Sequence, residues 1–240
     1  MTSKFAAPEG SPSVAGNVSG LRHYEPPKLR LAGRRIADDP VEVRALDILG
    51  AIVMLIVFAP LMLVVAAAVY LSNPGPILFK QKRIGRNGQL FYCYKFRTMA
   101  TDAEARLQSV LANDPVARAE WERDHKLRND PRIVGIGHFL RKSSLDELPQ
   151  IFNVLKGEMS LVGPRPIVEA ERKKYGRYFS HYCSVRPGIT GLWQVSGRND
   201  VEYRRRVAYD VVYARRSHSG DYLGILVKTV PSVLASRGSY

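Results

Sequence analysis

Two adjacent carboxylates, Asp146 and Glu147, are the side chains of this sequence best placed to do chemistry. They precede apolar residues spaced at i, i+3, i+4 and i+7, which predicts a helix that starts near Asp146 and ends at Gly157. The dipole of such a helix lowers the pKa of a carboxyl group in its first turn and keeps it ionised. An ionised carboxylate can cap a helix, bind a metal or attack phosphorus, and the pair alone leaves these roles open. The residues of the predicted apolar face are Leu148, Ile151, Phe152 and Leu155.

Arginines in rigid loops follow the two carboxylates. Arg165 lies between two prolines, so its backbone is held extended and its side chain has little conformational freedom to lose. Arg198 follows Gly197, and a glycine lets the backbone approach a ligand closely. Because a guanidinium offers a planar fork of donors to phosphate, both arginines are candidates for phosphate binding. The alternative is that both lie in ordinary surface turns.

The composition points to an anionic partner. The chain of 240 residues carries 36 Lys and Arg against 22 Asp and Glu, a net charge of +14. This excess suits nucleic acid, an anionic membrane surface or a phosphorylated substrate. Cys93 and Cys183 lie far apart in the sequence without metal-ligand spacing, so we expect two buried thiols in a reducing compartment and neither a zinc site nor a disulfide framework.

The chain divides into three predicted parts. Residues 1–40 are rich in Gly, Ser, Pro and Ala without apolar periodicity, which predicts a disordered tail and no signal peptide. Residues 41–72 contain an apolar segment that we expect to enter a membrane. Residues 73–240 are expected to form one α+β domain, since the chain length allows a single sizeable core plus appendages.

The apolar segment has two membrane interpretations. Ile48–Leu71 is almost wholly apolar and would reach roughly 36 Å as one helix, enough to cross a hydrocarbon core of about 30 Å. However, Pro60 lies in its middle, and basic residues flank both of its ends equally. The positive-inside rule is then satisfied if both flanks stay cytoplasmic, which requires a helix broken near Pro60 that enters and leaves through one leaflet. These facts leave a spanning and a re-entrant helix equally open.

A β-hairpin is expected after this segment. Ile77–Gln81 and Gln89–Thr98 are rich in β-forming residues and flank an Asn-Gly pair, which is a strong hairpin signal. The period of a strand places Lys95 and Arg97 on the same face. That face is either a solvated or headgroup-facing edge or a phosphate-binding strand.

The C-terminal part predicts further helices. After position 201, apolar residues spaced as on one face of a helix are crowded by arginines, as in a basic amphipathic helix at a membrane interface. Ordinary packing on the core is the alternative. A second apolar run follows at Leu223–Leu234.

Four motifs, in order along the chain, resemble those of the bacterial sugar transferase family, the monotopic polyprenyl-phosphate phosphoglycosyl transferases. The resemblance covers roughly residues 42–240, and the four motifs together are far more specific than any one of them. They are Lys95-Phe96-Arg97-Thr98-Met99, Ser144-Leu145-Asp146-Glu147-Leu148-Pro149-Gln150, Leu161-Val162-Gly163-Pro164-Arg165-Pro166 and Arg186-Pro187-Gly188-Ile189-Thr190-Gly191.

The resemblance implies a monotopic protein on the cytoplasmic face of the bacterial inner membrane. Its N-terminal helix would be re-entrant and broken at Pro60, with a small β-hairpin and several interfacial amphipathic helices in the cytoplasmic domain. Family members usually carry a serine before this proline, whereas this chain has Ala59. The shape of the break is therefore one point where the chain departs from the family pattern.

The resemblance also implies an activity. Asp146 would attack the β-phosphorus of a UDP-sugar, with UDP-glucose or UDP-galactose favoured, forming a phosphosugar aspartate and releasing UMP. Polyprenyl (undecaprenyl) phosphate would then accept the sugar phosphate, as the first membrane step of exopolysaccharide or glycoconjugate synthesis. Mg²⁺ would be held beside Asp146 and Glu147, because a dication brings two negative groups together. The implied substrate-binding residues are Arg165, Arg198, Lys95, Arg97 and Arg141.

A second hypothesis needs only the positive charge. A non-catalytic basic membrane scaffold could bind anionic lipid or nucleic acid, with binding that weakens as salt rises. Such a scaffold would not need the acid pair or a glycine-flanked arginine. The sequence therefore favours an enzyme without a nucleic-acid partner, and it allows an oligomer.

Overall fold

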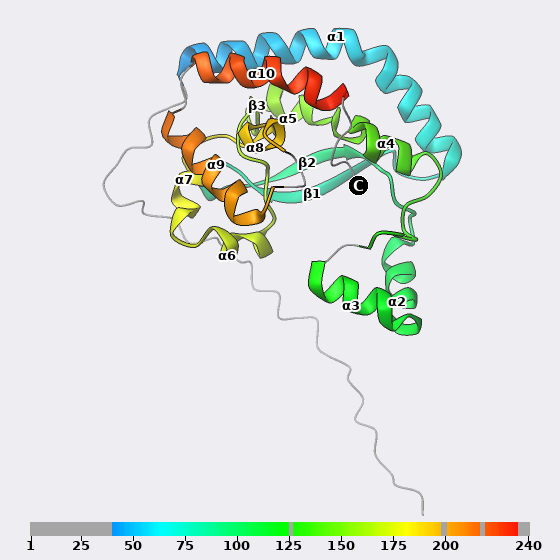
Figure 1. Ribbon diagram of the computed structural model, residues 1–240. Helices are drawn as coiled ribbons and strands as arrows, with labels where there is room; N and C mark the ends of the chain where they lie inside the picture. Colours follow the sequence, from blue (N-terminus) through cyan, green and yellow to red (C-terminus); the bar gives the residue numbers. More distant parts are fainter. Residues whose placement is uncertain (1–39, 125–126, 198–200, 217–218, 235–240) are drawn as a thin grey trace, which may run out of the picture.

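The computed structural model describes residues 40–124, 127–197, 201–216 and 219–234, and the predicted disordered tail lies outside them except for its last residue. Within these residues the fold is mixed α+β, as expected (Figure 1). A long helix, α1 (Val41–Ser72), precedes a hairpin of β1 (Leu78–Ile84) and β2 (Leu90–Phe96). The other elements are η2 (Arg86–Gly88), α2 (Ala103–Asn113), α3 (Pro115–Asp124), α4 (Gly137–Ser143), η3 (Leu145–Glu147), α5 (Gln150–Lys156), β3 (Ser160–Val162), η4 (Glu169–Glu171), α6 (Arg172–Tyr175), η5 (Gly176–Tyr178), α7 (Phe179–Cys183), β4 (Gly188–Thr190), α8 (Leu192–Val195), α9 (Tyr203–Arg216) and α10 (Ser219–Leu234).

Helix α1 buries one stripe of its surface against the body, from its first turn to its last. Among the described residues it is the one helix that is long and apolar enough to cross a membrane, judged by length and composition. Much of its remaining surface is apolar and exposed, including Leu49, Ile56 and Leu63. The buried stripe consists of Val43, Asp47, Ala51, Met62, Val65 and Val69.

Pro60 lies inside α1 without ending it. The family resemblance implies a helix broken at this residue, and the structure has one helix from Val41 to Ser72 with Pro60 inside it. Figure 1 shows that this helix curves over the body in its second half. A proline removes one backbone donor and kinks a helix, and the hydrogen bonds on either side are enough to keep the chain helical.

The predicted hairpin is confirmed. Strands β1 and β2 pair antiparallel, with Lys80 opposite Tyr94 and Ile84 opposite Leu90. The turn between them uses left-handed backbone at Asn87 (φ 58°) and at the glycine that follows it (φ 74°). Asn and Gly adopt this conformation at low cost, which explains why the pair marks the turn.

A buried asparagine closes the free edge of β2. The Asn153 side chain of α5 accepts a hydrogen bond from the Tyr94 backbone N–H at 3.0 Å and donates one to the Tyr92 carbonyl at 2.7 Å. These bonds replace two that a third strand would make, so these two backbone groups of β2 are paired. They also fix β2 relative to α5, and with it the next residue, Lys95.

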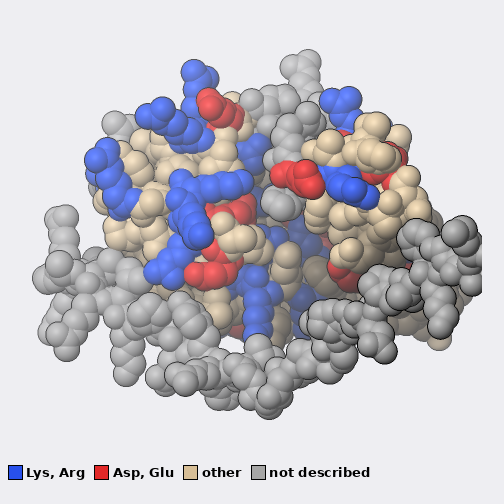
Figure 2. Space-filling view, turned by 90° about the horizontal axis from the view of Figure 1, so that it is seen from below, with Lys and Arg blue, Asp and Glu red and all other residues tan. Residues whose placement is uncertain are grey.

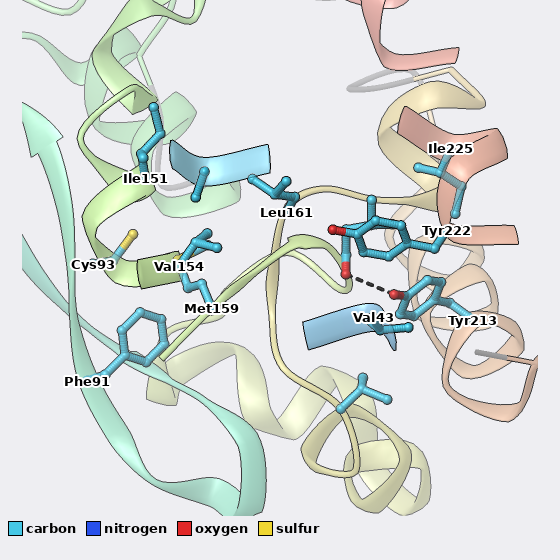
Figure 3. Close-up of a cluster of buried hydrophobic side chains, with 13 residues drawn as sticks. Val43, Phe91, Cys93, Ile151, Val154, Met159, Leu161, Tyr213, Tyr222 and Ile225 are labelled. Carbon is cyan, nitrogen blue, oxygen red and sulfur yellow. Dashed lines mark hydrogen bonds between the residues drawn. The ribbon is translucent and has the colours of Figure 1, made fainter. Parts of the chain in front are cut away.

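The main core lies where α1, α5, β3 and α10 meet (Figure 3). Short strands β3 and β4 pair in parallel, with Val162 opposite Thr190. Tyr213 of α9 closes this core, and its hydroxyl donates to the Val162 carbonyl at 2.8 Å, drawn as the dashed line in Figure 3. Residues from both ends of the sequence are thus brought together around β3.

The two cysteines are buried free thiols, as the sequence predicts. Burial raises the pKa of Cys93 and of Cys183 to about 11. Both thiols therefore stay protonated at neutral pH and act as small core residues.

The burial of the apolar residues in α9 and α10 differs from the prediction. The apolar residues of α9, such as Val207 and Tyr213, are buried in the body, so the alternative of ordinary packing is correct for this helix. Helix α10 buries Tyr222 and Ile225 and leaves a second apolar stripe exposed beside α1 (Figure 1). That exposed stripe is Leu223, Val227 and Val230.

Candidate active site

A serine with left-handed backbone conformation, Ser144, precedes the turn that carries the acid pair. Helix α4 ends before Ser144, whose φ of 59° is unusual for a residue other than glycine, and a single 3₁₀ turn, η3, carries Asp146 and Glu147. Helix α5 begins only at Gln150, so the predicted helix start near Asp146 is wrong by four residues. Pro149 has no N–H to donate and precedes the first helical residue, where that loss costs nothing.

The predicted apolar face of this helix is confirmed for three of its four residues. Ile151 is fully buried, and Leu148 and Leu155 pack against the core. Phe152 instead leaves 38% of its surface exposed. Gly157 ends the helix, as expected, in left-handed backbone with φ 83°.

Lys95 connects the hairpin to the acid pair. Its Nζ lies 2.5 Å from Glu147 Oε1 and 3.5 Å from Asp146 Oδ2. All three side chains are shielded but reachable, with 19%, 24% and 11% of their surfaces exposed. An ammonium group therefore lies between two carboxylates at the edge of solvent.

The two carboxyl groups have shifted pKa values in opposite directions. Burial raises the pKa of Asp146, although Lys95 opposes this shift, so the predicted lowering by a helix dipole is wrong for this residue. For Glu147 burial acts in the same upward sense, but Lys95 and Arg165 outweigh it and lower the pKa to about 2. A three-residue turn has almost no dipole, so burial and neighbouring charges decide the ionisation.

Arg141 faces the acid pair from the last turn of α4. Its Nε donates to the Thr98 hydroxyl at 2.9 Å. Burial lowers the pKa of Arg141, and the negative charges of Asp146 and Asp130 act in the opposite direction. The structure therefore places Arg141 in the site, as the resemblance implies, and Thr98 holds its guanidinium.

Lys95 and Arg97 do not act on the same group, contrary to the strand pattern. The backbone pairing of the hairpin still continues at Arg97, whose N–H donates to the Ile77 carbonyl at 2.9 Å, so the two side chains differ in their partners. Arg97 donates a hydrogen bond to the Asn73 carbonyl at the end of α1, beside Gly75. Its Nε and Nη1 are buried without a hydrogen-bond partner. Arg97 thus contacts the connection after α1, whereas Lys95 contacts the acids.

The Pro-Arg-Pro loop packs against the body on two sides, and its arginine is exposed. Arg83 of β1 donates to the Pro166 carbonyl at 3.0 Å. On the other side, a Cβ on Gly163 would come within 2.4 Å of the Arg186 carbonyl oxygen, so the loop is packed too tightly for a side chain there. Arg165 lies close enough to Glu147 to lower the pKa of that carboxyl group.

The remaining predicted residue, Arg198, lies outside the described residues. Two residues of the site were missed from the sequence: Thr98, which holds Arg141, and Asn153, which fixes the strand of Lys95. Thr98 belongs to the first of the four family-like motifs, which is a signal for it in the sequence. Asn153 carries no local signal, because its partners are far away in the sequence.

Basic side chains gather on the face of the molecule turned away from α1. Figure 2 shows Lys and Arg over much of this face and in its hollowed centre, with acidic side chains among them. This distribution suits an anionic ligand that approaches from the side opposite α1.

The acid pair is the place in the described residues where a cation could be held together with a substrate phosphate. The described residues contain no group of three or more His, Cys, Asp or Glu arranged to hold a metal by themselves. However, Mg²⁺ is commonly bound by one or two carboxylates plus substrate phosphates. The Lys95 ammonium already occupies a position between Asp146 and Glu147, which shows that the two carboxylates share one cation-binding region.

Comparisons with known proteins identify the family of the chain. The model of the bacterial sugar transferase family matches residues 40–236. The chain is 51% identical over 197 residues to an undecaprenyl-phosphate galactose phosphotransferase of Salmonella typhimurium, covering 82% of this chain and 41% of that protein. It is 48% identical over 197 residues to the exopolysaccharide production protein ExoY of Rhizobium meliloti, covering 82% of this chain and 87% of that protein.

A third relative has a different sugar in its name. It is a UDP-glucose:undecaprenyl-phosphate glucose-1-phosphate transferase of Caulobacter vibrioides, 39% identical over 214 residues, with 86% of this chain and 74% of that protein covered. The chain thus spans less than half of the galactose phosphotransferase and most of the other two relatives. Since the family model matches the whole described region, the chain belongs to the bacterial sugar transferase family.

Proposed function

We propose that this chain transfers a hexose-1-phosphate from a UDP-sugar to undecaprenyl phosphate and releases UMP, as the first membrane step of exopolysaccharide synthesis. The observation that carries the proposal is the acid pair, Asp146 and Glu147, held against Lys95 within reach of Arg141 and Arg165. The names of the relatives support the two substrates and divide between glucose and galactose as the sugar.

In the proposed first step, a carboxylate oxygen of Asp146 attacks the β-phosphorus of the UDP-sugar. A P–O bond to Asp146 forms, the bond between the β-phosphorus and the bridging oxygen breaks, and UMP leaves with that oxygen. In the second step, an oxygen of undecaprenyl phosphate attacks the same phosphorus and regenerates the Asp146 carboxylate. One phosphoanhydride is broken and one is made, so the reaction needs no other energy source.

The other residues of the site have distinct roles in this proposal. Arg165 and Arg141 bring positive charge to the phosphate oxygens, where negative charge accumulates in phosphoryl transfer. The burial that raises the pKa of Asp146 makes its ionised carboxylate a stronger base, and Lys95 keeps that carboxylate charged. Asp146 and Glu147 would hold Mg²⁺, which when bound neutralises charge between the nucleophile and the phosphates.

We further propose that α1 is monotopic, with both ends on the cytoplasmic side. Asp47, near its start, is hydrogen-bonded to Ser160 of the body, and Val69, near its end, packs with Phe96 and Leu140. One domain that contacts both ends of a helix supports a membrane association in which neither end crosses the bilayer. The exposed apolar surface of α1 continues onto α10, which supports a shared membrane face.

The test is a screen of UMP release over a panel of UDP-sugars, with undecaprenyl phosphate and Mg²⁺ in detergent or lipid nanodiscs. A donor labelled in the sugar should also leave its label on the wild-type protein when the lipid acceptor is omitted. In Asp146→Asn neither UMP nor labelled protein should form, and retained labelling would exclude Asp146 as nucleophile. Salt-sensitive lipid binding without UMP release from any donor would favour the scaffold hypothesis.

A further inference from the structure

We propose that Phe79 of β1 contacts the hexose of the UDP-sugar, so that its ring forms one wall of the donor-binding site. The inference rests on the proposed function and deepens it, because it assigns a residue to the part of the donor that differs between substrates. Phe79 lies outside the four family-like motifs and is 48% exposed. Binding sites for small molecules combine aromatic side chains of this kind with a few polar groups.

The register of the hairpin places Phe79 beside Lys95. The two residues lie directly opposite each other in the antiparallel pair of β1 and β2. Residues at such positions point to the same face of a sheet, with Cβ atoms about 5 Å apart. Lys95 Nζ lies 2.5 Å from Glu147 Oε1 and 3.5 Å from Asp146 Oδ2. The Phe79 ring is therefore on the face of the hairpin that meets the acid pair.

The side chains on the opposite face of the hairpin agree with this register. Lys80 Nζ lies 5.8 Å from the centre of the Tyr94 ring. Lys82 Nζ lies 5.9 Å from the centre of the Tyr92 ring. Both are cross-strand pairs, and they alternate along the strand with the position of Phe79. The hairpin thus has one face with lysine-tyrosine pairs and another face that carries Phe79.

The face with Phe79 has two different ends. Arg83 lies four residues later on the same strand and so on the same face. Its Nη1 donates to the Pro166 carbonyl at 3.0 Å, and its Nη2 donates to Gln81 Oε1 at 2.6 Å. Four residues of a strand extend about 14 Å. One end of this face therefore meets the Pro-Arg-Pro loop, and the other end carries an exposed aromatic ring.

The parts of a UDP-sugar match this arrangement. Its diphosphate is anionic and suits Arg165 of the Pro-Arg-Pro loop. Its hexose is uncharged, and the CH groups of a pyranose ring form an apolar face that can pack on an aromatic side chain. In the proposed reaction the hexose is bonded to the phosphorus that Asp146 attacks. The hexose is thus next to the acid pair, on the face where the Phe79 ring lies.

The experiment compares Phe79→Ala and Phe79→Leu with the wild type, and Leu78→Ala is the matched control. Leu78 precedes Phe79 on the same strand, is 38% exposed and points to the opposite face. UMP release gives kcat/KM for undecaprenyl phosphate and for the donor that the wild type turns over fastest among the UDP-sugars screened. Inhibition by added UMP gives the Ki of UMP, and the midpoint of thermal unfolding is recorded for each variant.

We expect Phe79→Ala to lower kcat/KM for the donor by about tenfold, as for loss of a stacking contact with an aromatic ring. Phe79→Leu keeps an apolar side chain without the ring and should lose less. The Ki of UMP should stay within about twofold in both variants, because UMP has no hexose and gains nothing from this contact. Leu78→Ala should change each of these values by less than about twofold.

The lipid acceptor gives a further expectation. When undecaprenyl phosphate reacts, the hexose is already attached to Asp146 through its phosphate in the proposed mechanism. Its contact with Phe79 is then the same before and during the second step. We therefore expect kcat/KM for undecaprenyl phosphate to change by less than about threefold in Phe79→Ala.

Three results with an active wild type would overturn the inference. A kcat/KM for the donor within about twofold of the wild type in Phe79→Ala would show that the ring makes no contact with the donor. An equally large rise in the Ki of UMP would place the ring on the uridine. A loss confined to undecaprenyl phosphate would place it on the lipid.

Two further outcomes are assigned in advance. If Phe79→Ala does not fold, the same comparison is made with Phe79→Leu, for which a loss of about threefold in kcat/KM for the donor is expected with an unchanged Ki of UMP. Absence of UMP release from the wild type with every donor would reject the proposed function, and the inference with it.

Discussion

Asp47 and Asp146 are both buried aspartates, yet their surroundings differ in kind. Asp47 in α1 is fully buried, and one of its oxygens accepts three hydrogen bonds from neutral donors. The whole Asp146 residue is 8% exposed, and its nearest cation is Lys95, whose Nζ lies 3.5 Å from Asp146 Oδ2. The donors to Asp47 are the Ser160 hydroxyl at 2.8 Å, the Leu161 backbone N–H at 2.8 Å and the Tyr222 hydroxyl at 2.7 Å.

The difference separates an anchor from a reactive group. The donors to Asp47 come from β3 and α10, so this carboxylate ties three segments together and has little capacity left on that oxygen. The other oxygen of Asp47 lies 3.9 Å from Arg44 Nη1. Asp146 instead lies near Lys95 and Arg141 and keeps access to solvent, so a substrate can reach it. A buried carboxylate with several hydrogen-bond donors stabilises a fold, and one at the edge of solvent can do chemistry.

The largest effect expected is on activity at Asp146. Asp146→Asn should lower UMP release by at least about 10³-fold, about 4 kcal/mol in the activation barrier, because an amide cannot attack phosphorus. The free energy of unfolding should change by less than about 1 kcal/mol, since the substitution also removes a partly buried charge. A variant that keeps more than a tenth of the activity would place the nucleophile elsewhere.

The opposite pattern, a large loss of stability, is expected at Asp47, the anchor. Asp47→Ala should lower the free energy of unfolding by about 3–5 kcal/mol, because three buried donors lose their acceptor. The matched control is Glu42→Ala, an exposed acid of the same helix, with a change of about 0.5 kcal/mol or less. Both are measured by denaturant unfolding in detergent, with activity scored per folded molecule. Equal losses in the two variants would refute the assignment of Asp47 as an anchor.

A third buried acid, Asp210, should make stability depend on pH. Burial raises its pKa to about 7, although the Tyr175 hydroxyl, 2.6 Å away, opposes the shift. The folded chain then binds a proton that the unfolded chain has already lost above about pH 4. Its contribution to the free energy of unfolding falls by up to about 1.4 kcal/mol per pH unit from about pH 4 to 7.

Asp210→Asn removes this titration. The free energy of unfolding of the wild type minus that of the variant should therefore shrink or change sign as pH rises through this range. Unfolding curves of both proteins at pH 5, 6, 7 and 8 give the difference directly. A constant difference across the series would mean that Asp210 is ionised in the folded chain.

The smallest effect expected is a shift of a pH profile. Lys95 opposes the burial that raises the pKa of Asp146, and together with Arg165 it lowers the pKa of Glu147 to about 2. In Lys95→Met both carboxyl groups should bind protons at a higher pH. The acid limb of the pH profile of UMP release should therefore lie at higher pH than in the wild type. The measurement is kcat/KM against pH for both proteins. A profile that only scales down, without moving, would show that Lys95 does not tune the acid pair.

Much of the chain could be predicted from local patterns. The long apolar run gave α1, the Asn-Gly pair gave the hairpin, and the proline-flanked arginine gave a loop. The acid pair was also found, because two adjacent carboxylates before an apolar run are a signal in themselves. The start of α5 was misplaced, since the left-handed Ser144 and the 3₁₀ turn are not visible in residue types alone.

Contacts between distant segments were not predictable in this way. Strand periodicity placed Lys95 and Arg97 on one face, but it could not show that Lys95 contacts the acid pair while Arg97 contacts the Asn73 carbonyl. The arginines of α9 suggested a membrane-facing helix, but packing buried Val207 and Tyr213 of this helix, while α10 buries one apolar stripe and leaves a second one exposed.

The amino-acid sequence by itself determined which segments are helix or strand, which part is apolar enough for a membrane, and which residues have the functional groups for phosphoryl transfer. Tertiary structure decided which of these groups meet: Lys95 with the acid pair, and Asp47 with β3 and α10. The reason is physical. Backbone preference and apolar period act over a few residues, whereas the pKa and the partners of a side chain depend on burial and charge from segments far away in the chain.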